Sequence, residues 1–437
     1  MKKVKFFIDD IPVEGSQDES IWTVAKRYGT TLPHLCYSDK PGYRADGNCR
    51  ACMVSVEGER VLAASCIRTP SEGMKVYTKD ERSSKSREMV IELLVTDQPK
   101  KEICHDPDSH FWQMADKVNV KKSRFDKRNP ETIPEADNSH VAMSVNLDAC
   151  INCNLCVRAC REVQVNDVIG MGNRGHTSQV IFDFNDPMGD STCVSCGECV
   201  QACPTGALME SNLLDEKGKK VVKPDRKVDS LCPYCGVGCQ LTYNIKGEKI
   251  VSVDGRDGPA NNNRLCVKGR FGFDYIHNPE RLTKPLIRKD GIPKDPKERI
   301  DPLNPLSHFR EATWDEALDL AASKLLKIRD SKNGKKALAG FGCAKGSNEE
   351  AYLFQKLVRT GFHNNNVDHC TRMCHASSVA ALMEAIGTGA VTAPVSEVKN
   401  AEVAILIGCR PTQNHPVAAT FIKNAVKNNG LKLIILD

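Results

Sequence analysis

The stretch Cys150-Ile-Asn-Cys-Asn-Leu-Cys-Val-Arg-Ala-Cys160 decides how the middle of this chain folds. Its spacing, CxxCxxCxxxC, recurs from Cys193 to Cys203, and Pro204 follows at once. Three closely spaced thiolates suit three irons of a cubane, and in proteins with two such runs the fourth cysteine ligates the other cluster. Residues 140–214 are therefore predicted to form a ferredoxin-type domain with two 4Fe-4S clusters, which lie close together and pass electrons.

The exchange of the fourth cysteine between the two runs predicts the ligands of each cluster. The first cluster is expected at Cys150, Cys153, Cys156 and Cys203. The second cluster is expected at Cys193, Cys196, Cys199 and Cys160.

Composition narrows what the rest of the chain can be. A length of 437 residues gives a soft expectation of about three domains, which excludes a small disulfide-stapled scaffold. The 61 basic and 56 acidic residues leave a net charge of only +5, so no nucleic-acid partner is predicted. The 21 cysteines are many for a chain of this size and call for a metal or redox explanation.

The expected compartment decides what those cysteines are for. The opening residues reach Asp9 and Asp10 without an apolar stretch or a cleavage site, so no signal peptide is expected. Apolar runs such as 403–407 fall far short of the roughly 20 residues that span a bilayer, so no membrane span is expected either. We therefore expect a cytoplasmic protein, in which thiols stay reduced and free to bind metal.

The first 80 residues contain four cysteines around a glycine-containing loop. Alternating apolar residues predict strands over 4–8, 52–56 and 61–64, with a helix over 21–28. Four thiolates are the ligand number of a 2Fe-2S cluster, although a zinc site would use the same ligands. The expected ligands are Cys36, Cys49, Cys52 and Cys66.

This pattern resembles the β-grasp 2Fe-2S ferredoxin-type domain at the head of the large redox subunits of NAD-linked enzymes. In those subunits the next segment, here a helical domain over 81–139, carries a 4Fe-4S site with one histidine and three cysteines. Here it contains Cys104, His105 and His110 but no second cysteine. We therefore expect no cluster there, and two structural histidines.

After a lysine-rich boundary at 215–227, expected to be a solvated hairpin or linker, residues 226–283 contain another cysteine set with a long last gap. The set is Cys232, Cys235, Cys239 and Cys266. It resembles the 4Fe-4S domain of the molybdopterin oxidoreductases. In that family a lysine two residues after the last cysteine, here Lys268, lies between the cluster and the pterin.

Residues 284–437 alternate between helices and apolar strands, which predicts the start of a parallel α/β domain whose ligands bind at the carboxyl ends of the strands. Two residue pairs have the spacing of helix N-terminal capping boxes, Thr313 with Glu316 and Ser347 with Glu350. Helices are expected over 318–328, 347–362 and 376–386 and from Pro416, and strands over 337–342, 403–408 and 431–436.

The stretch Asn365-Asn-Val-Asp-His-Cys-Thr-Arg-Met-Cys-His375 resembles the catalytic subunit of molybdenum- or tungsten-dependent formate dehydrogenases. There, a cysteine or selenocysteine at the place of Cys374 ligates the metal. A histidine follows it, as His375 does here, and imidazole is suited to handling the proton released from formate. The alternative for this pair is a buried core cysteine beside a capping histidine.

The stretch Gly408-Cys-Arg-Pro-Thr-Gln-Asn-His415 resembles the family's loop for one guanine-dinucleotide arm of the bis-pterin cofactor. The resemblance assigns this role to Gly408, Asn414 and His415. The cysteines without ligand spacing are expected to be small buried or half-buried thiols. They are Cys343, Cys370 and Cys409.

As a whole, the chain resembles the N-terminal half of the catalytic subunit of cytoplasmic NAD-dependent formate dehydrogenase. The resemblance implies one 2Fe-2S cluster, three 4Fe-4S clusters and a Mo- or W-bis(molybdopterin guanine dinucleotide), with a flavin- and iron-sulfur-containing NAD-reducing subunit as partner. Family subunits continue beyond a strand like 431–437, so we expect this chain to be catalytically incomplete. The alternatives are another molybdopterin oxidoreductase, such as a nitrate reductase, and a complex I-like electron-transfer subunit or relay fragment without catalysis. The histidine after Cys374 favours formate.

Overall fold

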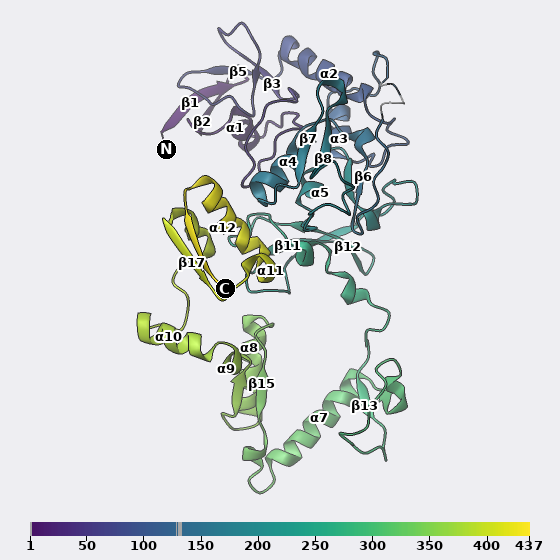
Figure 1. Ribbon diagram of the computed structural model, residues 1–437, viewed down its shortest axis with the longest axis vertical. Coiled ribbons are helices and arrows are strands. Elements are labelled where there is room, and N and C mark those ends of the chain that lie inside the picture. The colour runs from purple at the N-terminus through teal and green to yellow at the C-terminus, as the bar shows by residue number, and fades with distance from the viewer. Residues whose placement is uncertain (1, 128, 130–132) are drawn as a thin grey trace. The chain divides into compact units, whose positions relative to one another are not determined.

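The N-terminal sheet follows from alternating apolar residues. In the computed structural model, which describes residues 2–127, 129 and 133–437, its strands are β1 (Lys3–Ile8), β2 (Ile11–Ser16), β3 (Met53–Val56), β4 (Ala63–Ala64) and β5 (Lys75–Tyr77). Their order is β2-β1-β5-β3-β4, with β1 and β5 parallel and the other pairs antiparallel (Figure 1). Val4, Phe6 and Ile8 all face the core, as a period of two requires. Helix α1 (Ile21–Arg27) adds Trp22 and Val24 to the same core.

Two helices follow this sheet. Helix α2 (Glu81–Thr96) begins at Asp80, whose side chain accepts a hydrogen bond from the Ser83 backbone amide. Helix α3 (His110–Lys117) contributes Phe111 and Trp112 to a core that also contains residues of the 2Fe-2S loop, Leu35 and Ala51. The helical segment therefore packs against the loop that carries the first cysteines.

In the repeat region each cysteine run leads into a short helix. Two antiparallel strand pairs enclose these helices, β6 with β9 and β7 with β8. The elements are β6 (Met143–Val145), α4 (Leu155–Arg158), the π-helical turn η3 (Ala159–Val163), β7 (Ile169–Gly172), β8 (Gln179–Phe182), α5 (Glu198–Ala202) and β9 (Leu208–Glu210). Their core includes Cys156, Cys160 and Cys199 among apolar residues, so these thiols are partly shielded from water.

The third cysteine region is an antiparallel sheet with a short helix. Its elements are β10 (Arg226–Leu231), β11 (Gln240–Lys246), β12 (Lys249–Gly255) and α6 (Val267–Phe271). Residues 215–227 are mostly exposed, and their first part is a hairpin turn closed by an antiparallel bridge between Leu214 and Lys220, in line with the expected solvated hairpin. The segment is also bound to residues 102–108. The Lys220 backbone amide donates to the His105 carbonyl oxygen at 2.8 Å, and Lys220 Nζ lies 3.0 Å from Asp106 Oδ2.

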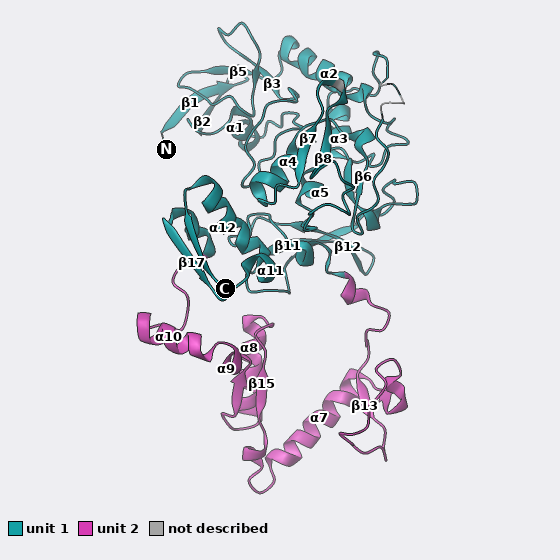
Figure 2. Cartoon of the chain, in the orientation of Figure 1, with its two compact units in different colours: residues 1–273, 395–437 teal, residues 274–394 magenta. Residues whose placement is uncertain are grey.

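The chain divides into two units, shown in different colours in Figure 2. Unit 1 comprises residues 1–273 and 395–437, and unit 2 comprises residues 274–394. The last part of unit 1 has the parallel pair β17 (Val403–Ile407) and β18 (Lys432–Leu436), with α11 (Pro411–Asn414) and α12 (Pro416–Asn428) between them. Helix α12 is attached to the repeat region, since Lys423 Nζ donates to the Val165 carbonyl oxygen at 2.9 Å and Lys427 pairs with Asp167 at 3.0 Å.

Unit 2 contains an antiparallel pair, a parallel pair and four α-helices within its described residues. They are β13 (Leu286–Arg288), β14 (Phe309–Glu311), α7 (Trp314–Arg329), β15 (Gly340–Gly342), α8 (Asn348–Lys356), β16 (Val367–His369), α9 (Thr371–Cys374) and α10 (Ala376–Ile386). The capping box of Ser347 and Glu350 is confirmed, and Thr313 caps α7 by accepting from the Glu316 amide. The parallel strand pairs of the α/β region thus fall into different units, β15–β16 in unit 2 and β17–β18 in unit 1. Across the described residues, no helix has the length and apolar character needed to cross a membrane.

Candidate functional site

The four cysteines of the N-terminal domain lie together, with thiol hydrogen bonds joining Cys36 to Cys49 and Cys66, and Cys66 to Cys52. The Cys49 backbone amide points at Cys36 Sγ over 3.4 Å, and the Ala51 amide points at Cys49 Sγ over 3.5 Å. The pKa of Cys36 lies well below its usual value, because the neighbouring thiols and amides donate hydrogen bonds to its sulfur. Such donors stabilise the thiolate, which is the form that binds iron.

The same loop needs a glycine at Gly47. This residue has φ +62°, and a Cβ on it would lie 2.0 Å from Ile67 Cδ1. Glycine adopts this backbone conformation without strain, and any larger residue would also have to displace the Ile67 side chain.

In the repeat region the structure brings together cysteines from both runs. Cys156 lies within electrostatic range of Cys153, Cys150 and Cys203, whereas Cys196 lies within range of Cys160 and Cys193. Burial raises the pKa of Cys196 to about 12, so iron binding would have to displace the proton. Two groups of four thiols therefore form, each with the exchanged fourth cysteine, and they fit cubane clusters in donor type and number.

The two groups also lie near each other, because Cys156 of the first is within electrostatic range of Cys199 of the second. The third cysteine region also brings four thiols together, in a single group. Cys239 has Cys232, Cys235 and Cys266 around it, and burial raises its pKa. Within the described residues, no group of three or more His, Cys, Asp or Glu side chains has the arrangement that would hold a single metal ion.

A buried arginine joins the 2Fe-2S loop to the first cysteine run. Arg158 is 1% exposed, and its Nη2 donates to the carbonyl oxygens of Cys36 at 2.6 Å and Cys153 at 3.2 Å. Cys36 and Cys153 share a small core with Leu155. The first cubane site therefore faces the N-terminal domain.

A second buried arginine joins the third region to the second run. Arg270, on α6, donates from Nε to the Cys196 carbonyl oxygen at 3.4 Å and from Nη1 to the Val253 carbonyl oxygen at 2.8 Å. Its Nη2 lies 3.6 Å from Glu198 Oε2. Tyr43, from the 2Fe-2S domain, donates to Glu198 Oε1 at 2.8 Å, so all three iron-sulfur regions meet at Glu198.

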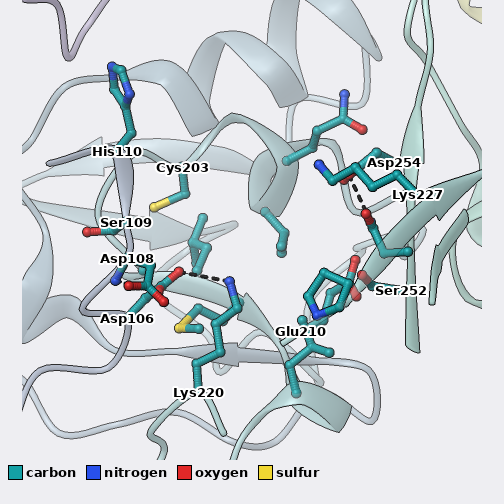
Figure 3. A pocket seen from close by; sticks show the side chains of 18 residues that line it. Asp106, Asp108, Ser109, His110, Cys203, Glu210, Lys220, Lys227, Ser252 and Asp254 are labelled. Atoms are coloured by element: carbon teal, nitrogen blue, oxygen red, sulfur yellow. Dashed lines mark hydrogen bonds and ion pairs between the residues drawn. The ribbon is translucent and has the colours of Figure 1, made fainter. Parts of the chain in front are cut away.

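A cavity of about 470 Å³ lies beside Cys203 in unit 1 (Figure 3). Acidic residues from different segments line it, and Asp106 is paired there with Lys220 at 3.0 Å. Glu210 is 6% exposed, and burial raises its pKa to about 7. The cavity therefore contains a carboxyl group that is partly protonated near neutral pH.

His105 and His110 have hydrogen-bond partners in the structure. His105 lies between the Asp148 carboxylate, 2.9 Å from Nε2, and the Gly218 carbonyl oxygen, 2.9 Å from Nδ1. His110 Nε2 lies 2.7 Å from the His34 carbonyl oxygen. These contacts support the expected structural roles. Cys104 is buried, and its thiol donates to the Lys101 carbonyl oxygen.

The predicted reacting residues belong to different units. Cys374 ends α9 in unit 2 and is exposed, so the alternative of a buried core cysteine is wrong for this structure. His375 follows it, and its carbonyl oxygen accepts from the Val379 amide at the start of α10. Lys268 lies on α6 of unit 1, two residues after Cys266, with an exposed side chain.

The predicted pterin loop lies in unit 1, between β17 and α12. Gly408 has φ +56°, Asn414 ends α11, and His415 is the N-cap of α12. Asn414 and His415 are exposed.

The expectation of buried or half-buried thiols at Cys343, Cys370 and Cys409 is wrong, because all three are exposed. Cys343 lines a cavity of about 560 Å³ at the carboxyl ends of β15 and β16, in unit 2. Cys370 Sγ accepts from the Ala344 amide at 3.3 Å. Both thiols therefore lie where a parallel pair exposes its ligand-binding end.

Known families match nearly every part of this arrangement. A 2Fe-2S iron-sulfur cluster binding domain matches residues 1–81, and a 4Fe-4S dicluster domain matches residues 149–207. A molybdopterin oxidoreductase Fe4S4 domain matches residues 225–278, and the molybdopterin oxidoreductase family matches residues 281–437. The chain is therefore similar to molybdopterin oxidoreductases in its last two matched segments and to iron-sulfur domains before them. The predicted fold class, with its 2Fe-2S, dicluster and Fe4S4 domains and the start of an α/β domain, is confirmed.

Similar proteins include curated relatives from bacteria. "Probable oxidoreductase YjgC" of Bacillus subtilis (strain 168) is 30% identical over 98% of this chain and 45% of its own length. "Putative formate dehydrogenase YrhE" of the same organism is 29% identical over 100% of this chain and 46% of its own length. A crystal structure of NAD+-reducing [NiFe]-hydrogenase in the H2-reduced state matches 48% of this chain and 87% of its own, with 25% identity and a TM-score of 0.43. The chain thus spans a little under half the length of the curated relatives it matches.

Several residues at these thiol sites have no sequence motif that marks them. Arg158 and Arg270 are two among 61 basic residues, and only their burial and long-range contacts distinguish them. Glu198 lies inside a cysteine run, so its position next to Cys199 could have drawn attention to it.

Proposed function

We propose that this chain is part of a formate dehydrogenase, in which formate is oxidised to carbon dioxide and the electrons leave through iron-sulfur clusters. The final acceptor in this proposal is NAD, reduced by a flavin- and iron-sulfur-containing partner subunit. A Mo- or W-bis(molybdopterin guanine dinucleotide), when bound, supplies the two-electron acceptor for formate. The proposal is supported by relatives that carry a formate dehydrogenase name and by the adjacent Cys374 and His375.

One observation carries the electron-relay part of the proposal: the thiol sites of unit 1 are in contact in series. Cys36 shares a core with Cys153, and Cys156 neighbours Cys199. Arg270 then connects Cys196 to α6, which begins directly after Cys266. Because a two-electron substrate must be oxidised through one-electron centres, a continuous series of this kind is what the function needs.

The ligand assignments belong to this proposal. One 2Fe-2S cluster would use the N-terminal set, and three 4Fe-4S clusters would use the two exchanged sets and the third region. The ligands are Cys36, Cys49, Cys52 and Cys66; Cys150, Cys153, Cys156 and Cys203; Cys160, Cys193, Cys196 and Cys199; and Cys232, Cys235, Cys239 and Cys266.

At the reacting end each residue has a separate task. Cys374 would hold the metal through its thiolate, a soft ligand suited to molybdenum or tungsten. His375 would accept the proton, and Lys268 would donate hydrogen bonds between cluster and pterin. Gly408, Asn414 and His415 would hold a nucleotide arm, together with the N-terminus of the 13-residue helix α12.

The cysteines also support a reducing compartment. All 21 are free thiols in the structure, and 16 of them belong to the proposed cluster sites. Free thiols at this density persist in the cytoplasm, which is the location we propose.

The decisive experiment uses the enzyme purified anaerobically with whatever subunits accompany it. We expect pterin and molybdenum or tungsten to be present, and formate to reduce a viologen dye and, through the partner, NAD. In a Cys374→Ser variant, formate should no longer reduce the dye, whereas the iron-sulfur spectra should persist.

Two other results would contradict the proposal. Nitrate-dependent oxidation of reduced viologen, without formate oxidation, would indicate a nitrate reductase. Iron-sulfur clusters without pterin or metal in the purified enzyme would indicate a complex I-like relay.

A further inference from the structure

Arg270 and Glu198 form a buried charge pair against the second cysteine run. Both side chains are 1% exposed, and their facing atoms are 3.6 Å apart. Arg270 also donates to the carbonyl oxygen of Cys196 at 3.4 Å and to Gln201 Oε1 at 2.6 Å. Since Glu198 is flanked in sequence by Gly197 and Cys199, both members of the pair lie beside expected ligands of one cluster.

The surrounding backbone holds the guanidinium in place. Gly197 has φ +67°, and a Cβ on it would lie 2.8 Å from Arg270 Cγ. The Val253 carbonyl oxygen accepts a third hydrogen bond from Arg270, at 2.8 Å. These contacts hold Arg270 against the loop between Cys196 and Cys199.

Other charged side chains lie near this pair and contribute to the electrostatic potential around it. Arg264 and Lys40 lie within electrostatic range of Glu198, and Asp254 acts on Lys40. Glu210 lies within range of Arg270. Lys423, on α12, lies within range of Cys160 and Cys196. Among these groups, Arg270 is the fully buried cation with a hydrogen bond to a ligand cysteine's backbone.

Buried charges of this kind act strongly on a nearby redox centre. Reduction adds one negative charge to a cluster, so a cation beside it favours the reduced form and an anion favours the oxidised form. The interaction grows as the local dielectric falls, and exposed charges at similar distances are screened by water and salt. Hydrogen bonding and burial are among the factors that set iron-sulfur potentials.

We propose that the Arg270–Glu198 pair sets the reduction potential of the 4Fe-4S cluster at Cys160, Cys193, Cys196 and Cys199, with Arg270 raising it and Glu198 lowering it. This inference rests on the cluster assignment of the proposed function but not on formate as the substrate. The two residues act on the cluster through their charge, as positioning residues, and neither touches a substrate. Because this cluster lies between its two neighbours in the series, its potential would control electron flow in both directions.

The test is an EPR-monitored redox titration of the full chain, reconstituted anaerobically with iron and sulfide. The cluster's signal is assigned by its loss in a Cys199→Ala variant. Arg270→Gln should lower the midpoint potential by ~59 mV. For a one-electron centre, this shift changes the ratio of reduced to oxidised cluster about tenfold at a fixed solution potential. Glu198→Gln should raise the midpoint by a similar amount, and Arg270→Lys should stay near the original value.

The matched control is Arg161→Gln. Arg161 lies next to ligand Cys160, but its side chain is 52% exposed and paired with Asp167 at 3.1 Å. Screening should limit its effect to less than about a threefold change in the ratio.

Opposite shifts in Arg270→Gln and Glu198→Gln support the proposal, because a loss of packing alone would not reverse sign between them. Equal-sign shifts, or shifts no larger than in Arg161→Gln, overturn it. If Arg270→Gln fails to assemble the cluster, Glu198→Gln decides: a raised midpoint supports the proposal and an unchanged one overturns it. Absence of the signal from the unmodified chain would instead refute the cluster assignment itself.

Discussion

Arg158 donates a 2.6 Å hydrogen bond from Nη2 to the carbonyl oxygen of Cys36, a residue 122 positions earlier in the sequence. The arginine side chain is 1% exposed, and its Nε lies 3.4 Å from Asp46 Oδ2. It also donates to the carbonyl oxygen of Cys153. One buried side chain thus ties an expected 2Fe-2S ligand to an expected 4Fe-4S ligand, so the spacing of these two sites depends on it.

Replacement of Arg158 should loosen this junction. Arg158→Met leaves the carbonyl oxygens of Cys36 and Cys153 without this buried donor, while Asp46 keeps Arg44 as a partner, and we expect a loss of about 3 kcal/mol of unfolding free energy. The urea midpoint for loss of the visible 2Fe-2S absorbance measures this. Arg44→Met is the control, since its side chain is 60% exposed and its ion pairs should contribute less than about 1 kcal/mol. Equal midpoints in the two variants would show that Arg158 does not hold the junction.

The exchange of cluster ligands between the two cysteine runs can be tested by iron content and EPR. Cys203→Ala should lose about four irons and should give the same spectrum as Cys150→Ala, because both remove a ligand of the same cubane. Cys160→Ala should instead match Cys193→Ala. A match between Cys203→Ala and Cys193→Ala would mean that each run binds its own cluster.

Cys104→Ala is the control for this series. The Cys104 thiol donates to the Lys101 carbonyl oxygen, and the neighbouring His105 is bound to Asp148 and Gly218. The variant should keep the full iron content. A loss of iron would reveal a cluster in the helical segment 81–139.

How far the sequence predicts this molecule depends on the range of each interaction. Local rules worked: the alternation of Val4, Phe6 and Ile8 predicted β1, and Ser347 with Glu350 predicted the start of α8. Strands β2 and β5 were missed, and β5 has only three residues, too few for a period-two pattern to stand out.

Long-range contacts could not be read from the sequence in the same way. The cysteine runs predicted which thiols meet because their spacing encodes the cluster ligands. Nothing comparable marks Arg270, whose partner Cys196 lies 74 positions away, or Lys220, which pairs with Asp106 across 114 positions. The exposure of Cys343 and Cys370 likewise follows from their place at the ends of β15 and β16, which sequence spacing does not reveal.

Gly47 offers a test of the cysteine loop that removes no ligand. Gly47→Ala places a Cβ 2.0 Å from Ile67 Cδ1 at φ +62°, so the Ile67 side chain or the loop between Cys36 and Cys49 must shift. We expect loss of the 2Fe-2S absorbance with the 4Fe-4S signals retained. Gly58→Ala is the matched control, because Gly58 also has a positive φ of +78° but nothing within 4 Å of its Cβ position. It should cost about 1 kcal/mol of stability and keep the cluster. Cluster loss in both variants would attribute the effect to backbone strain alone.

Glu210 should make the stability of unit 1 depend on pH. Burial raises its pKa from the ordinary 4.5 to about 7, so between these values the folded chain binds a proton that the unfolded chain has released. The stabilising contribution is therefore fully present below about pH 4.5 and is lost as pH rises through 7, by about 3 kcal/mol in total. The glutamine in Glu210→Gln stays neutral at all these pH values. The variant should therefore lack the fall in urea midpoint between pH 5 and pH 8 that comes from ionisation of Glu210. Glu248→Gln, at a side chain that is 93% exposed, should leave the decline unchanged. An unaltered decline in Glu210→Gln would show that Glu210 titrates as it does in water, and that the cavity beside Cys203 is wetter than its burial indicates.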